Sequence, residues 1–191
     1  MKELLASIRQ CRECAAHFSH EPRPVLQASV TARICVAGQA PGRRAHDSGL
    51  PFNDPSGDRL RQWMGVDRTV FYDASKIAII PMGFCFPGYD AKGGDLPPRP
   101  ECAPLWREKL FALLPDVKLT LLVGQYSQAW HLGGGRRKNL TETVREWRSY
   151  PPRILPLPHP SWRNTGWMRK NPWFEAELLP ELRRRVSQLI H

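Results

Sequence analysis

The chain has 191 residues, of which 41% are hydrophobic, and 28 Lys and Arg against 18 Asp and Glu give it a formal charge of +10. This composition excludes a disordered chain, and no apolar run approaches the ~20 residues of a membrane span. The length suits a single domain over residues 1–191 with a sizeable core.

The amino terminus and the cysteine content indicate the compartment. Met1–Leu5 is not followed by the apolar core of a signal peptide, so we expect a cytoplasmic protein with no membrane partner. We also expect the protein to be a monomer. Five cysteines in a reducing compartment favour metal binding or catalysis over disulfides. The positive charge favours a polyanionic partner, and nucleic acid is the first candidate.

Helical and strand patterns alternate along the chain. Short apolar runs predict strands over 32–37, 76–80, 118–123 and 153–157. Helices are predicted over 2–10, over 57–64 with Ser56 as its N-cap, from 100 or 103 to 114, from 124, over 141–147, and over 173–189 with a break at Pro180. Loops are predicted over 81–101 and 160–172. This alternation predicts an α/β fold, a three-layer α/β/α sandwich around a central, mostly parallel four-stranded sheet.

Four of the cysteines stand in loops or at helix ends. Cys11 and Cys14 form a C-x2-C pair, and Cys85 and Cys102 follow much later. Two close ligands and two distant ones can hold either Zn²⁺ or an iron–sulfur cluster, and the spacing does not distinguish them. Cys35 lies inside the first predicted strand and is expected to be a small core residue.

Two further motifs follow predicted strands. The first strand runs into Gly38-Gln39-Ala40-Pro41-Gly42 and then Gly49-Leu50-Pro51-Phe52, and the fourth runs into His159-Pro160-Ser161. Ligands of open α/β sheets bind at the carboxyl ends of the strands, so both motifs are expected at one site.

Taken together with the cysteines, these ordered motifs resemble the uracil-DNA glycosylase superfamily, and its iron–sulfur families 4 and 5 are the most similar. The resemblance extends from residue 11 to residue 161. It implies a base-excision enzyme that extrudes uracil or another deaminated base from duplex or single-stranded DNA and hydrolyses its N-glycosidic bond. It also implies that Cys11, Cys14, Cys85 and Cys102 hold a structural [4Fe-4S] cluster, with zinc as the alternative.

The resemblance assigns roles to residues of the two motifs. Phe52 would stack on the extruded base, and His159 would stabilise negative charge on the departing base. Base and ribose would be bound by Gly38, Gln39, Ala40 and Ser161. Gln39 matches a glutamine of family 1 and is grouped with the catalytic residues.

Asp54 corresponds to a family 5 aspartate that is assigned to water activation. We therefore expect Asp54 to activate water or to stabilise a cationic sugar. The alternative for this residue is a turn before Pro55 without a role in catalysis.

Some positions depart from the family pattern. Ala40 stands where family 1 has a water-activating aspartate, and Gly42 stands where it has a tyrosine that excludes thymine. Pro81 occupies the position of the family 4 asparagine that pairs with the uracil edge, and proline offers neither a polar side chain nor an N–H. Hypoxanthine or xanthine is therefore an alternative substrate, and a catalytically silent DNA-binding protein is an alternative function. Ala91–Glu101 lacks the histidine of a branch that bonds covalently to DNA.

The segment after His159 mixes aromatic and cationic side chains. In the family this position forms the loop that enters the duplex, where cations contact phosphates and an apolar side chain takes the place of the base. The expected DNA-binding residues are Trp162, Arg163, Trp167, Met168, Arg169 and Lys170. The alternative is a loop that only packs on the C-terminal helix.

Overall fold

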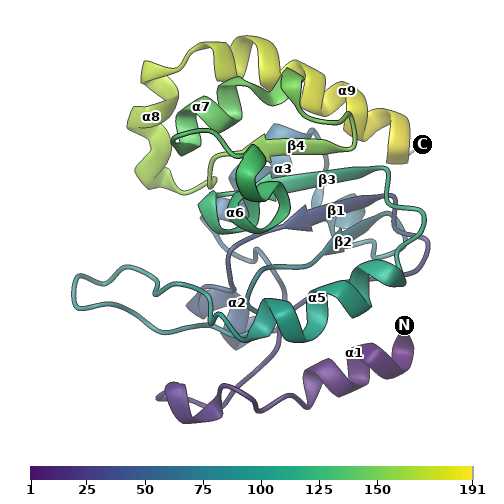
Figure 1. The fold of residues 1–191 in the computed structure, drawn as a ribbon, viewed down its shortest axis with the longest axis vertical. Coiled ribbons are helices and arrows are strands. Elements are labelled where there is room, and N and C mark those ends of the chain that lie inside the picture. Colours follow the sequence, from purple (N-terminus) through teal and green to yellow (C-terminus); the bar gives the residue numbers. More distant parts are fainter. Residues whose placement is uncertain (191) are drawn as a thin grey trace.

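The computed structural model describes residues 1–190, which form one parallel sheet with helices on both faces (Figure 1). The strands are β1 (Ile34–Ala37), β2 (Ile77–Ile79), β3 (Leu119–Val123) and β4 (Ile154–Leu157). They pair in the order β2-β1-β3-β4, and every pair is parallel. The predicted fold class is confirmed, and the four predicted strands lie within a residue or two of their expected bounds.

The connections between strands are mostly helical. The α-helices are α1 (Lys2–Arg9), α2 (Arg43–Ser48), α3 (Pro55–Met64), α4 (Arg68–Phe71), α5 (Cys102–Ala112), α6 (Gln125–Leu132), α7 (Leu140–Arg145), α8 (Thr165–Lys170) and α9 (Leu179–Ile190). Single turns of 3₁₀-helix are η1 (Ala15–His17), η2 (Gly133–Gly135), η3 (Trp147–Ser149) and η4 (Trp162–Asn164), and η5 (Phe174–Leu178) is a π-helical turn. Among residues 1–190, no helix combines the length and the apolar character that crossing a bilayer requires.

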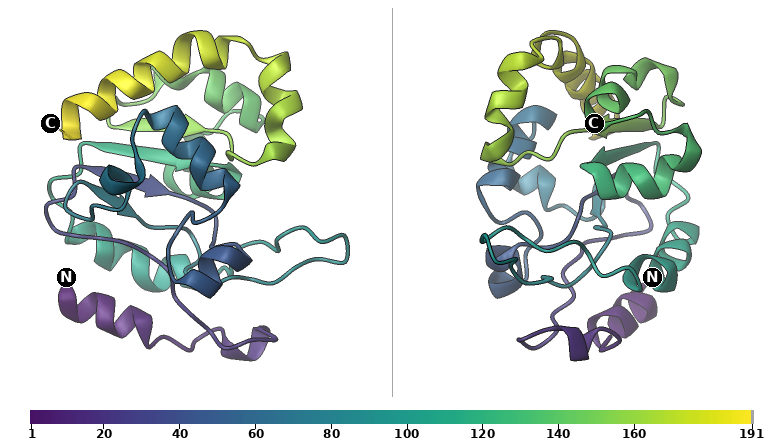
Figure 2. Two further views of the ribbon diagram at one scale, coloured as in Figure 1. Left: turned by 180° about the vertical axis from the view of Figure 1, so that it is seen from behind. Right: turned by 60° about the vertical axis from the view of Figure 1, so that its left-hand side comes forward.

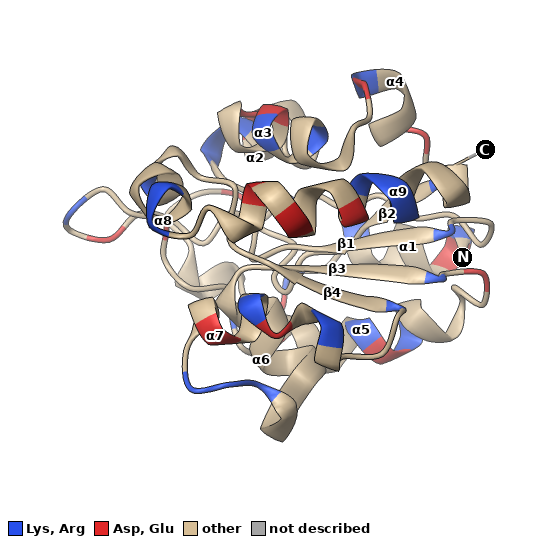
Figure 3. Cartoon of the chain, turned by 90° about the horizontal axis from the view of Figure 1, so that it is seen from above, with Lys and Arg blue, Asp and Glu red and all other residues tan. Residues whose placement is uncertain are grey.

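Alternate strand residues face opposite sides of the sheet, because side chains along a strand alternate. Ile34 and Val36 pack in a core with α3 and α9, whereas Cys35 packs in a second core with α1 and α5. Figure 3 shows α3 and α9 above the sheet and α5 below it. Both faces of the strands are therefore covered, which is why these strands are apolar without alternation.

The carboxyl ends of the strands meet at one edge of the sheet. The loops that begin at Gly38, Ile80, Gly124 and Pro158 all leave from this edge. The segment 81–101 contains no helix or strand, as predicted, and folds back on itself through an isolated antiparallel bridge between Tyr89 and Asp95. Figures 1 and 2 show it projecting from the body beside α2, on the side where α8 lies.

Three local predictions need correction. The N-cap of α3 is Asp54, not Ser56, because the Asp54 carboxylate accepts the hydrogen bond from the Gly57 amide. The segment 160–172 is not a loop, since it contains η4 and α8. The C-terminal helix is disturbed before Pro180 by η5, and Pro180 itself is the second residue of α9. A π-helical turn is one way to accommodate the hydrogen bond that proline cannot donate.

Candidate active site

A pocket at the carboxyl edge of the sheet brings the two predicted motifs together. Its lining comes from the loop after β1, the start of α3, the end of β2, the 81–101 loop and the second residue after β4. The lining residues are Gly38, Gln39, Ala40, Pro41, Gly42, Pro51, Phe52, Asp54, Ser56, Ile79, Pro81, Asp95 and His159. Gly38 and His159 therefore share one cavity although they lie far apart in the sequence, as the strand-end argument predicts.

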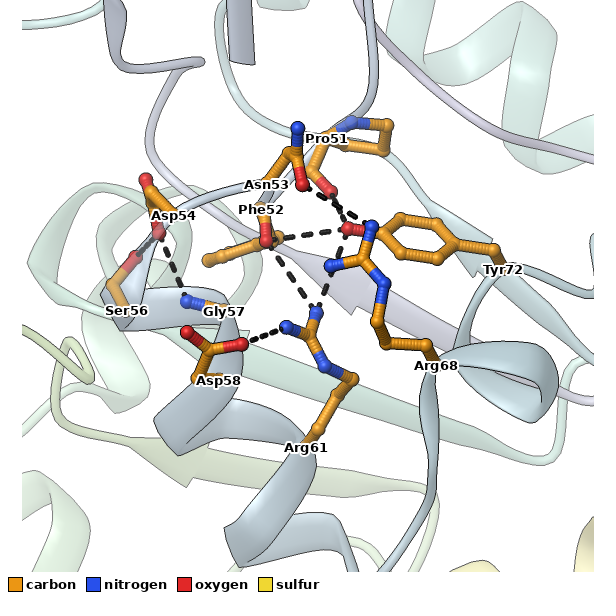
Figure 4. A network of polar contacts seen from close by, with 10 residues as sticks. All are labelled: Pro51, Phe52, Asn53, Asp54, Ser56, Gly57, Asp58, Arg61, Arg68 and Tyr72. Carbon is orange, nitrogen blue, oxygen red and sulfur yellow. Dashed lines mark hydrogen bonds and ion pairs between the residues drawn. The ribbon is translucent and has the colours of Figure 1, made fainter. Parts of the chain in front are cut away.

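Phe52 is held in an unusual backbone conformation. Its φ of 55° makes it the one non-glycine residue with positive φ among the residues that the structure describes. Such a conformation costs about 1–3 kcal/mol and persists only where the surroundings impose it. Here the Tyr72 hydroxyl donates to the Phe52 carbonyl at 3.3 Å, and Arg61 Nη1 donates to the same oxygen at 3.5 Å (Figure 4). The ring meets Phe71 edge-on with 6.3 Å between centroids.

Two glycines make room for this arrangement. A Cβ on Gly38 would lie 3.1 Å from Phe52 Cζ, so the ring lies against the backbone of the first motif. A Cβ on Gly57 would lie 1.8 Å from the Phe52 carbonyl oxygen. The glycine in Asp54-Pro55-Ser56-Gly57 is therefore a steric requirement of the Phe52 conformation, which the sequence does not reveal.

The Asp54 side chain caps the N-terminus of α3. Its Oδ1 accepts from the Gly57 amide at 2.9 Å and from Ser56 Oγ at 2.5 Å. Its Oδ2 lies 3.7 Å from the position that a Cβ on Gly42 would occupy, on the pocket side. One carboxylate oxygen thus caps α3 and the other faces the cavity.

We expect Asp54→Ala to destabilise the protein by about 1 kcal/mol and Asp54→Asn to cost much less. Asparagine retains an oxygen that accepts at the N-cap, whereas alanine leaves the Gly57 amide without this partner. Thermal or urea unfolding of both variants measures the difference. Equal stability of the two variants would show that the cap contributes nothing measurable.

His159 reaches the pocket from the end of β4. Burial lowers the pKa of its imidazole, and the negative charge of Asp54 opposes this shift. The ring is therefore neutral at neutral pH and can donate one hydrogen bond to a group in the pocket. The Asn164 side chain donates to the His159 carbonyl at 2.7 Å and fixes the backbone there.

The rim that faces His159 is built from the loops after β1 and β2. The Met82 amide donates to the Gly38 carbonyl at 2.9 Å, and the Gly83 amide donates to the Gln39 carbonyl at 3.0 Å. The Gln39 side chain contacts the Leu96 carbonyl at 3.5 Å, which connects this rim to the 81–101 loop. Pro81 lines the pocket without a polar side-chain atom.

An outer groove continues from the pocket toward the surface. It is lined by Gln39, Ala40, Pro41, Asp95, His159, Ser161, Arg163 and Asn164. Ser161 lies in this groove, and its carbonyl accepts from Arg59 of α3 at 2.9 Å. Asp95 lines both the pocket and the groove, and the sequence does not predict this position. A single aspartate in a proline- and glycine-rich loop carries no sequence signal, because only the folding of the loop brings it to the site.

The structure separates the six expected DNA-binding residues. Trp162 is 72% exposed, and Arg163, Arg169 and Lys170 are also exposed. Figure 3 shows cations on α8 at this edge. Trp167 instead donates from Nε1 to Thr141 Oγ1 at 2.7 Å, and Trp167 and Met168 pack against the hydrophobic core.

The four cysteines outside the sheet also come together. Cys11, Cys14, Cys85 and Cys102 line one pocket, together with apolar side chains such as Phe18, Phe84 and Trp106. Burial raises the pKa of Cys85 and of Cys102 to about 12, and neighbouring cysteines add to both shifts. Within residues 1–190, no three side chains of His, Cys, Asp or Glu are close enough together to hold a metal ion. In number and chemistry, the four thiols nevertheless fit the ligand set of a thiolate-bound metal. Cys35 is fully buried in β1, as expected.

Comparison with known proteins assigns the family. The wild-type SMUG2 of Pedobacter heparinus is 12% identical, with 83% of this chain and 74% of that chain covered, and its TM-score of 0.38 supports no inference about this chain. A family model described as the uracil DNA glycosylase superfamily matches residues 26–183, which include the pocket and the outer groove but not Cys11 and Cys14. The protein belongs to the uracil DNA glycosylase superfamily.

Proposed function

We propose that this protein is a DNA glycosylase that extrudes a deaminated base, uracil or a related one, and hydrolyses the bond between that base and deoxyribose. The observation that carries the proposal is the convergence of Gly38, Phe52 and His159 on one pocket within a chain of this family. A pocket is required because a stacked base does not expose its glycosidic bond to an enzyme.

The pocket supplies two interactions that such a reaction needs. The Phe52 ring provides a flat apolar surface on which an extruded base can stack, and its backbone is fixed by Arg61 and Tyr72. The neutral His159 imidazole can donate to an oxygen of the base, whose negative charge increases as the bond breaks. This hydrogen bond is stronger in the transition state than in the ground state, and for that reason it lowers the barrier.

The exposed residues beside the pocket suit contact with DNA. The exposed Trp162 would fill the space that an extruded base leaves, while the exposed Arg163, Arg169 and Lys170 would supply charge for phosphates. Trp167 and Met168 would support this region from below, since they pack on the core.

The choice of base depends on the polar groups that meet its edge in the pocket. Pro81 lines the pocket at the position where a family 4 enzyme reads the uracil edge with an asparagine. Without a donor and an acceptor there, the pocket loses one means of choosing uracil over hypoxanthine or xanthine. This observation favours a broader range of deaminated bases as the second candidate.

A base-release panel tests the function. Purified protein is incubated with DNA that contains uracil, hypoxanthine, xanthine or mispaired thymine, in single and double strands, and free base is measured. We expect release of at least one deaminated base and none of thymine from a normal A·T pair. If DNA is bound but no base is released, the protein is a silent DNA-binding member of the family, and Pro81 is the first residue to examine.

We also propose that Cys11, Cys14, Cys85 and Cys102 hold a [4Fe-4S] cluster, with Zn²⁺ as the alternative. When bound, the metal centre would provide a covalent cross-link and no chemistry of the reaction itself. The four ligands would join the segment after α1, the loop after β2 and the first turn of α5. Apolar neighbours such as Phe84 and Trp106 would limit the access of water.

We expect anaerobically purified protein to be brown and to contain about four irons per chain. Cys85→Ser should lose most of this iron, whereas Cys35→Ala should keep it, because Cys35 lies in the sheet. Ligation energy is also folding energy, so removal of the metal should make residues 10–24 sensitive to proteases. A colourless protein with stoichiometric zinc would favour the alternative, and full iron content in Cys85→Ser would rule out this ligand set.

A further inference from the structure

Two carboxyl groups from different parts of the chain face the candidate base pocket. Asp54 comes from the start of α3 and Asp95 from the 81–101 loop. Each has its Oδ2 atom 3.7 Å from the position that a Cβ on Gly42 would occupy. The two oxygens are therefore at most twice that distance apart, across the space above Gly42.

The two carboxyls differ in what already binds them. Asp54 Oδ1 accepts two hydrogen bonds at the N-terminus of α3, and this fixes its position. No hydrogen bond to the Asp95 carboxyl is donated by any residue in the range 1–190, and Asp95 as a whole is exposed. Asp95 is thus free to bind a water molecule or a substrate group.

The backbone around Asp95 is nevertheless ordered. The Asp90 amide donates to the Gly94 carbonyl at 2.7 Å, and the Leu96 amide donates to the Gly88 carbonyl at 3.0 Å. Asp90 Oδ1 accepts from the Lys92 and Gly94 amides, both at 2.8 Å. Gln39 contacts the Leu96 carbonyl, so the loop is attached to the pocket rim next to Asp95.

Asp95 lies where the pocket opens into the outer groove. Both cavities share Gln39, Ala40, Pro41, Asp95 and His159. A base bound on Phe52 occupies the inner cavity, and the DNA backbone must remain outside, near Arg163. The bond between base and sugar then crosses this shared boundary, next to Ala40. The methyl side chain of Ala40 can neither accept nor donate a proton.

We propose that Asp95 is the carboxylate that activates the attacking water, an inference that rests on the proposed glycosylase function. The water oxygen bonds to C1′ of the deoxyribose as the C1′–N bond breaks. The electron pair of that bond leaves with the base, whose negative charge His159 stabilises. The Asp95 carboxylate takes one proton of the water and later releases it to solvent or to the departed base.

The charges around Asp95 suit this role. Partial burial of the carboxyl raises its pKa, Asp54 and Asp90 raise it further, and Arg163 opposes them. A raised pKa brings a carboxylate nearer to the working pH and makes it a better base. Because the base must be ionised, excision should fall on acidification at a pH above the usual aspartate range. His159 also faces the pocket, and burial lowers the pKa of its imidazole while the negative charge of Asp54 opposes this shift.

Single-turnover base release by Asp95→Asn, Asp95→Ala and Asp54→Asn tests the proposal. General bases contribute ~10²–10⁴ in rate, so both Asp95 variants should be slower by about a hundredfold or more, with DNA affinity and thermal stability close to wild type. Asp54→Asn decides between the two pocket carboxyls, because a larger loss of rate there than in Asp95→Asn would assign water activation to Asp54 instead. Asp116→Asn, an exposed carboxyl at the opposite edge of the sheet, is the matched control.

Two further readouts distinguish a base from a structural residue. Formate should partly restore Asp95→Ala but not His159→Ala, because it can replace a missing carboxylate. The acid limb of the wild-type pH profile should be absent from Asp95→Asn. Wild-type rates of base release in both Asp95 variants would overturn the proposal and leave the glycosylase function standing. A loss of rate without formate rescue and without a change in the pH profile would overturn it too. A wild-type protein that releases no base overturns the function and this proposal together.

Discussion

His159→Ala should slow single-turnover base release by ~10²–10³ while DNA affinity stays within a few-fold of wild type. The imidazole acts on negative charge that exists only as the glycosidic bond breaks, so binding of the intact DNA does not depend on it. Burial keeps the ring neutral, and a neutral ring still has one N–H to donate. Rapid-quench assays with excess enzyme measure the chemical step, and a binding titration with the same DNA measures affinity.

A conservative variant is the control for this result. His159→Asn retains an N–H donor at the end of β4 and should recover part of the lost rate. Wild-type excision by His159→Ala on every accepted base would mean that this pocket is not the site of chemistry. Equal losses of rate and DNA affinity would instead assign His159 to binding.

Gly57→Ala should disable the pocket, although Gly57 itself does not line it. The added Cβ would overlap the Phe52 carbonyl oxygen, which Tyr72 and Arg61 hold from the other side. The chain must move Phe52 or the first turn of α3, and such overpacking typically costs about 1–3 kcal/mol. Because a shift of ~1 Å in a positioning group can cost ~10² in rate, excision should fall at least as far.

Gly134→Ala is the matched control, because a Cβ at Gly134 meets nothing within 4 Å. Urea unfolding and single-turnover excision are measured for both variants and for wild type. If Gly57→Ala unfolds and excises like Gly134→Ala, the strained Phe52 conformation is not needed for the reaction. A loss of excision in Gly57→Ala that is absent from Gly134→Ala would support the positioning role of Phe52.

The sequence predicted the sheet and the meeting of its motifs for physical reasons. Strands covered on both faces must be apolar, so Ile34–Ala37 and Leu119–Val123 stand out from the surrounding loops. Parallel strands place their carboxyl ends at one edge, so residues after β1 and β4 had to meet there. The position of His159 beside Gly38 in one pocket follows from this rule.

Other features depend on contacts that no local pattern encodes. Asp95 reaches the pocket only because its loop folds back between Gly88 and Leu96. The 160–172 segment was expected to be a loop, but Arg59 of α3 holds it by donating to the Ser161 carbonyl and to Thr165. Trp167 and Trp162 look alike in the sequence, and only the packing of Trp167 near Thr141 and Phe174 distinguishes them.

The structure of the His159→Ala variant bound to DNA that contains the preferred base tests the central claim most directly. The slow variant should trap the substrate before the glycosidic bond breaks. We predict a base extruded from the DNA, stacked on Phe52 beside Gly38, with its C1′ atom at the boundary that Asp95 lines. A base that remains in the helical stack, or one bound away from the pocket after β1 and β4, would contradict the account.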